Sequence, residues 1–146
     1  MDFFSAMEVS ASGMTAERTR LNVASSNLAN ASSTKSADGQ GPYKRKDVVV
    51  ASAPTTTRLS GGRAGAVAGE AFSAVVASIQ EDASPPRMEF DPGHPDANAD
   101  GYVAYPNVNV VEEMVDMITA SRAYQAGVTA LDSTIQMAER ALGIGK

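Results

Sequence analysis

The chain has 146 residues, the size of one ordinary domain, with an apolar fraction of 43% and no cysteine. Its net charge of -5 disfavours nonspecific binding to nucleic acid or to an anionic membrane, and the missing cysteines exclude disulfide frameworks, thiol catalysis and cysteine metal sites. Aromatic residues make up only 5% of the chain while small and flexible apolar residues are plentiful, which favours close helix contacts over one bulky core.

The first predicted element is a helix over residues 3 to 30. Apolar side chains recur there in alternating steps of three and four residues, a spacing that places them along one stripe of a helix. The main members of this stripe are Phe4, Met7, Met14, Leu21 and Leu28. Asp2 is a candidate N-cap, and the helix is expected to end near Asn30 because residues 31 to 42 are rich in turn-forming side chains.

The middle of the chain has the composition of short strands and loops. Residues 48 to 50 and 72 to 79 are rich in β-branched and small side chains, which predicts strands, and the glycine-rich residues 61 to 69 lie between them. Residues 84 to 101 contain several prolines and glycines, so they are expected to form an extended, turn-rich connection. A last short strand is predicted at residues 102 to 105.

The strongest pattern predicts a second helix over residues 108 to 142. An unbroken series of four- and three-residue steps defines a stripe for packing against another helix. Its main members are Val110, Met114, Met117, Tyr124, Val128, Leu131, Ile135 and Leu142. Asn107 is a plausible N-cap and Gly143 a plausible C-terminal stop. Such a helix would extend on the order of 50 Å, longer than the first helix can cover, so apolar surface should remain for other chains.

These elements predict an α+β fold in three parts. Residues 1–34 and 106–146 form long terminal helices packed together as a coiled coil, and residues 35–105 form a small β-rich middle domain with loops. The predicted assembly interface consists of the apolar members of the two helical stripes named above.

One segment resembles the first half of a calcium-binding loop. Asp96, Asn98 and Asp100 alternate before Gly101, as the oxygen ligands of such a loop do. The twelfth position, however, is Asn107, where that loop requires a bidentate glutamate. A tight polar turn leading into the strand at residues 102 to 105 is therefore the favoured interpretation, and no metal is predicted.

The other candidate groups do not form a site either. The glycine-rich segment lacks the ending of a phosphate loop, and His94, the only histidine, lies in a turn with no second ligand beside it. Glu112 and Glu113 are adjacent and would point in different directions on a helix, so they are interpreted as solvated charges. The basic residues 44 to 46 are interpreted as charge on an exposed strand. We therefore predict no cofactor, no catalytic residues and no enzyme activity.

Two stretches resemble a known family. Residues 21 to 30, with the core Asn27-Leu28-Ala29-Asn30, closely resemble the N-terminal signature of the flagellar rod and hook family. Residues 106 to 118, together with 120 to 126, resemble its C-terminal signature. The segments around residues 91 to 95 and 100 to 103 point to the proximal-rod members of that family.

The resemblance implies that the terminal helices pair into the inner layer of a helical tube while the middle segment forms a small outer domain. It also implies export through the flagellar type III apparatus, assembly in the periplasm, and contact with other rod proteins and with copies of the same chain. The start of the sequence has no positive n-region, and no apolar run reaches the length of about 20 residues that crosses a bilayer, so neither a cleaved secretory signal nor membrane insertion is expected.

The predicted function is mechanical: a structural subunit of the flagellar basal-body rod that polymerises through its terminal helices into a torque-transmitting tube. The alternative from another class is a soluble binding module, such as a chaperone-like helical hairpin with a β insertion. An assembly subunit should have ends that become ordered in the polymer, whereas a binding module should be compact alone.

Overall fold

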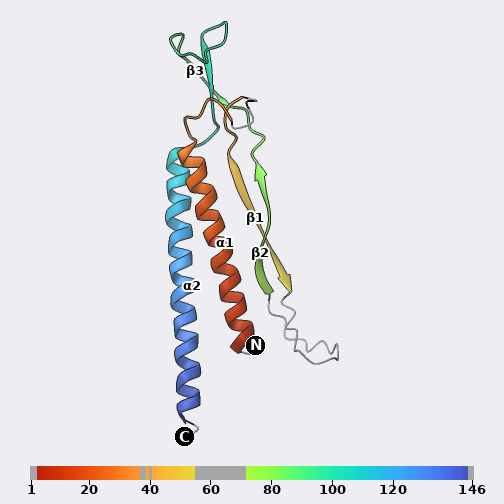
Figure 1. Ribbon diagram of the computed structural model, residues 1–146, viewed down its shortest axis with the longest axis vertical. Helices are drawn as coiled ribbons and strands as arrows, with labels where there is room; N and C mark the ends of the chain where they lie inside the picture. The colour runs from red at the N-terminus through yellow and green to blue at the C-terminus, as the bar shows by residue number, and fades with distance from the viewer. Residues whose placement is uncertain (1–2, 37–38, 40, 55–71, 145–146) are drawn as a thin grey trace.

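The computed structural model describes residues 3–36, 39, 41–54 and 72–144. Figure 1 shows an elongated molecule in which two long helices run side by side, with a β-hairpin along one of them and a second, shorter β-ribbon at one end. In chain order the elements are α1 (Phe3–Ala29), β1 (Lys46–Pro54), β2 (Phe72–Glu81), β3 (Arg87–Phe90), β4 (Tyr102–Tyr105) and α2 (Val110–Ile144).

The two helices are antiparallel and approach closely through small side chains. Ala16 and Ala24 of α1 and Ala120 of α2 are all buried, and a Cβ atom added to Gly127 of α2 would lie only 2.8 Å from Cγ of Met14 on α1. Small residues let two helix backbones come together without large side chains to separate them. The C-terminal turns of α2 continue past the N-terminal end of α1 (Figure 1).

Strands β1 and β2 form an antiparallel hairpin that lies along α1, on the side away from α2 (Figure 1). The register runs from Lys46 opposite Glu81 to Pro54 opposite Phe72, with an irregularity between Val49 and Val50. Because a two-stranded ribbon has a right-handed twist, the two strands cross, so β1 lies next to α1 at one end of the hairpin and β2 lies next to it farther along. Near one end Lys46 of β1 bonds to α1, and farther along the amide of Ala74 in β2 donates to Oγ of Ser12 at 3.1 Å.

Strands β3 and β4 pair into a second antiparallel ribbon, from Arg87 opposite Tyr105 to Phe90 opposite Tyr102. Gly101 enters β4 with φ of +80°, and a Cβ there would lie 2.9 Å from the Phe90 ring, so both the backbone conformation and the close approach require glycine. Val103 is fully buried, whereas all four residues of β3 are exposed. The ribbon therefore has little core of its own.

The predicted helices and the strands at residues 48–50, 72–79 and 102–105 are confirmed, as is the end of the first helix near Asn30. Three details were wrong. Strand β3 lies inside the segment expected to be only extended and turn-rich. The N-cap of α2 is Asn109, whose Oδ1 accepts the amide of Val111 at 3.1 Å, because Asn107 instead bonds Arg45. Gly143 lies within α2, since the helix continues to Ile144.

Other predictions lie outside the described residues, namely the N-cap at Asp2 and the glycine-rich loop at 61–69. Within the ranges that the structure covers, none of the helices combines the length and the hydropathy needed to span a bilayer.

The two glycines inside the helices give a test of the close helix contact. Alanine is preferred over glycine in a helix interior by about 1 kcal/mol, and a Cβ at Gly13 would meet nothing within 4 Å. Gly13→Ala should therefore stabilise the purified chain by about that amount, whereas Gly127→Leu should cost about 1–3 kcal/mol because it displaces Met14. Urea unfolding followed by circular dichroism measures both, and a stabilising Gly127→Leu would contradict the close approach of α1 and α2.

Candidate functional site

The most deeply buried polar side chain of α1 is Asn27, in the last turns of the helix. It is 1% exposed, and its amide group makes four hydrogen bonds. Its Nδ2 donates to the carbonyl of Lys46 at 2.8 Å and to Oε2 of Glu113 at 3.0 Å. Its Oδ1 accepts from the amide of Lys46 and from the hydroxyl of Tyr43, both at 2.9 Å. An asparagine can donate twice and accept twice, so Asn27 is fully satisfied without water.

Glu113 brings α2 to the same point. It lies in the first turn of α2, where a carboxylate complements the helix dipole, and it is only 1% exposed. Its Oε2 accepts from Asn27 and its Oε1 accepts from Nε of Arg45 at 2.6 Å. The prediction that Glu113 is a solvated charge was wrong, because the first turn of α2 packs this carboxylate against the end of α1 and the start of β1.

Arg45 completes the cluster from the segment that leads into β1. Its side chain is 22% exposed, it lies 3.8 Å from Asp116 in a second ion pair, and its main-chain amide donates to Oδ1 of Asn107. Partial burial alone lowers the pKa of Arg45, but the hydrogen bond and charge of Glu113, with Asp47 and Asp116, outweigh it, so the pKa is raised. The prediction that Arg45 is simply exposed strand charge was wrong, since it neutralises a buried carboxylate.

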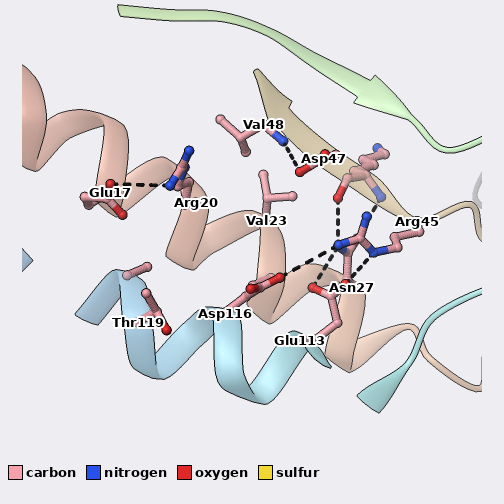
Figure 2. Close-up of a pocket in the computed structure, with 13 residues that line it drawn as sticks. Glu17, Arg20, Val23, Asn27, Arg45, Asp47, Val48, Glu113, Asp116 and Thr119 are labelled. Atoms are coloured by element: carbon pink, nitrogen blue, oxygen red, sulfur yellow. Dashed lines mark hydrogen bonds and ion pairs between the residues drawn. The ribbon is translucent and has the colours of Figure 1, made fainter. Parts of the chain in front are cut away.

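Asn27, Arg45 and Glu113, with the main chain of Lys46, form what we term the polar junction. It forms one end of an open cleft of about 310 Å³ between α1, β1 and α2 (Figure 2). The residues that line the cleft are Glu17, Arg20, Val23, Ala24, Asn27, Arg45, Lys46, Asp47, Val48, Glu113, Asp116, Thr119 and Ala120. Most of its charged groups pair with one another, as Arg20 does with Glu17 at 3.6 Å and Arg45 does with Glu113 and Asp116. Its one hydroxyl, on Thr119, has no histidine among these residues to activate it. The arrangement is suited to joining three elements.

The segment with half of a calcium loop forms turns that lead into β4, as predicted. The carboxylate of Asp96 accepts from Oγ1 of Thr34 at 2.8 Å and from Nζ of Lys35 at 2.5 Å. Oδ1 of Asn98 accepts the amides of Asp100 and Tyr102. These oxygens already have partners within the chain, and among the described residues no three metal-ligating side chains lie together.

The predicted turn position of His94 is confirmed, and its role there is local. Its Nδ1 accepts the amide of Asp96 at 3.1 Å, and its ring packs edge-on against Tyr105. The hydrogen bonds from Lys35 and Thr34 lower the pKa of the Asp96 carboxyl, and the charges of Lys35 and His94 add to this effect.

The predicted assembly residues fall into two groups. Those partly shielded within the chain are Met7, Met14, Leu21, Leu28, Met117, Leu131 and Ile135. Those that remain exposed are Phe4, Val110, Met114, Tyr124, Val128 and Leu142. The stripe on α2 is therefore divided between a side that covers α1 and a side that faces solvent.

Sequence reasoning missed a neighbouring row on α2. Val111, Met114, Val115 and Ile118 are exposed by 48 to 67% of their surface. Their spacing of three and four residues places them on one side of the helix. We term these four residues the outer α2 face. Three of these four residues lie outside the four-and-three series that predicted the first stripe. A prediction based on that one series therefore does not include the outer α2 face, which lies beside the first stripe.

Comparison with known proteins gives matches along the whole chain. Residues 7–35 match the family model "Flagella basal body rod protein", and residues 99–144 match "Flagellar basal body rod FlgEFG protein C-terminal". The chain is 42% identical over 150 residues to the flagellar basal-body rod protein FlgC of Borreliella burgdorferi, covering 99% of this chain and 98% of that protein. It is 42% identical to FlgC of Bacillus subtilis and 40% identical to FlgC of Salmonella typhimurium, each over the full length of both chains.

Replacing Asn27 tests the polar junction. Asn27→Ala leaves the amide and carbonyl of Lys46 and one oxygen of Glu113 without their partner, so it should cost about 2–4 kcal/mol of unfolding free energy. Asn22→Ala, at an exposed position of the same helix, should change stability by less than about 0.5 kcal/mol. Chemical denaturation of the purified chain measures both, and equal effects would show that the junction contributes nothing.

Proposed function

Because this chain belongs to the FlgC family of flagellar basal-body rod proteins, it is a structural subunit of the rod, and we propose that it polymerises through the outer α2 face together with the exposed parts of its terminal helices. The family is one of structural proteins, which agrees with the prediction that the chain is not an enzyme. It also favours the rod subunit over the alternative of a soluble helical-hairpin binding module or chaperone.

The observation that carries the proposal is the outer α2 face. Four large apolar side chains lie together over two turns of a helix in water, and each is about half exposed or more. Burial of apolar surface is worth roughly 25 cal/mol per Å², so an exposed row of this kind marks a surface that is stabilised by a partner. Within the described residues, neither the β1–β2 hairpin nor the β3–β4 ribbon packs against α2.

The position of this row suits an open assembly. α1 and the hairpin lie together on one side of α2, so the outer α2 face is free to contact a different surface of the next subunit. A contact between two different surfaces repeats without closing unless its rotation completes a ring, and it generates a helical tube. The coiled-coil packing predicted for the terminal helices belongs to this proposal and would form along such contacts.

The proposed mechanical role is the transmission of torque along that tube. The polar junction ties α1, β1 and α2 together at one end, and α2 extends over 35 residues, or on the order of 50 Å. A force applied to one end of α2 is then carried along its hydrogen-bonded backbone and into α1 and the hairpin at the junction.

Family membership implies assembly with other rod and basal-body proteins. We further propose contact with copies of the same chain, export through the flagellar type III apparatus, and assembly in the periplasm. These finer points rest on the resemblance of the terminal signatures to those of exported rod subunits.

The outer α2 face can be tested without disturbing the isolated fold. Val115→Asp and Ile118→Asp place a carboxylate where the side chain is already 54 to 55% exposed, so stability of the purified chain should change by less than about 0.5 kcal/mol. In the polymer the same carboxylate would be buried without a partner, so rods should be missing and cells non-motile although the protein is produced. Basal bodies counted by electron microscopy give the readout.

Asp132→Ala and Glu139→Ala are matched controls at exposed charged positions of the same helix, and they should spare motility. Leu131→Asp is less informative, because Leu131 is partly shielded in the free chain and its replacement would also weaken the fold. Wild-type swimming of the Ile118→Asp strain would refute the outer α2 face as an assembly surface.

A further inference from the structure

Two segments that are about 60 residues apart in sequence meet at the carboxylate of Asp96. Thr34 and Lys35 follow the end of α1, and each donates to a different oxygen of Asp96, at 2.8 and 2.5 Å. Both the Thr34 and the Asp96 side chains are partly buried. A carboxylate that receives a hydroxyl and an ammonium group from one neighbouring segment makes a directed, charge-assisted contact.

The turn that carries Asp96 is held together by its own hydrogen bonds. The amide of His94 donates to the carbonyl of Asp91, and the amide of Asp91 donates to the carbonyl of Gly101. Nδ1 of His94 in turn accepts the amide of Asp96. This turn joins β3 to β4, so the ribbon and the turn would move as one unit and Asp96 connects that unit to the end of α1.

Apart from this contact the ribbon is held through β4, where Val103 is fully buried, and not through β3. All four residues of β3 are exposed, including Met88 and Phe90, which are 52 and 63% exposed. After β4 the chain is anchored again, where Val108 is buried and Asn107 accepts the amide of Arg45. These attachments lie within β4 and just after it, whereas Asp96 lies in the turn before β4, so its contact adds a separate point at which the ribbon is held.

We propose that the contact of Asp96 with Thr34 and Lys35 is a latch that holds the β3–β4 ribbon in one orientation relative to the helix pair and that opens when the carboxylate loses its charge. The groups that face Asp96 are the ammonium of Lys35 and the hydroxyl of Thr34 from the segment after α1, and the imidazole of His94 from its own turn. The latch is independent of the outer α2 face.

The direction of the acid response follows from the lowered pKa of Asp96. A carboxyl whose pKa falls on folding contributes fully above its ordinary value of about 3.9, and the contribution is lost as the pH falls through the lower, folded value. The latch should therefore be closed at neutral pH and open only under strong acid. Replacing Asp96 by alanine should reproduce the open state at neutral pH.

Electron spin resonance can measure the ribbon's orientation, because the chain has no cysteine of its own to interfere. Met88→Cys on β3 and Ser25→Cys on α1, both exposed, carry the two spin labels. With the latch intact the distance distribution at neutral pH should be narrow. Adding Asp96→Ala should widen it by at least about twofold, and Lys35→Met should widen it less, since Thr34 still donates to Asp96.

Glu89→Gln is the matched control, because the exposed Glu89 pairs with Arg87 at 3.4 Å within the ribbon, and among the described residues no hydrogen bond or ion pair links its side chain to the segment after α1. It should leave the distribution narrow, and far-ultraviolet circular dichroism should show unchanged helix content in every variant. A broad distribution in the parent chain, a narrow one in Asp96→Ala, or equal widening by Glu89→Gln would each overturn the latch.

Discussion

The structure depends on the four hydrogen bonds of one side chain, Asn27. Its amide group pairs with both main-chain groups of Lys46 as a neighbouring strand would, and it also reaches Glu113 on α2. Because Glu113 is buried, it needs a positive partner, which Arg45 supplies from the segment before β1. Three elements that are distant in sequence are thus brought to one point by polar groups that satisfy each other, and a shift in any one of them would leave buried groups unpaired.

The polar junction compensates for a small apolar core. Among the described residues, the buried apolar side chains are few and none is larger than valine, because two long helices and a ribbon side by side enclose little volume. Many large apolar side chains consequently remain at the surface of α2 and the hairpin. In a subunit of the flagellar rod this surface is useful, since the contacts that the chain cannot make with itself are available to its neighbours.

The sequence predicted the helices and three of the four strands that the structure describes, because hydrophobic periodicity and β-branched runs are local signals. It did not predict the polar junction. Glu113 has the same appearance in sequence as Glu112, and its burial depends on where α1 ends and β1 begins. The predicted stripe on α2 identified only part of the exposed apolar surface. An ideal helix drifts from a strict seven-residue repeat, and the exposed Val115 and Ile118 lie beside the predicted stripe. Asn27 and Glu113 both lie within the stretches that match the flagellar family models, but these matches span residues 7–35 and 99–144 and do not single out either residue.

The most direct measurement of the central claim is a double-mutant cycle between Arg45 and Glu113. Arg45→Met, Glu113→Gln and the double variant are unfolded in urea as purified chains, and their free energies are compared with that of the parent. A junction that joins the segment before β1 to α2 through this ion pair predicts a coupling energy of about 1–3 kcal/mol. Additive effects within about 0.3 kcal/mol would contradict this, because two groups that act separately do not form the ion pair that joins the segment before β1 to α2.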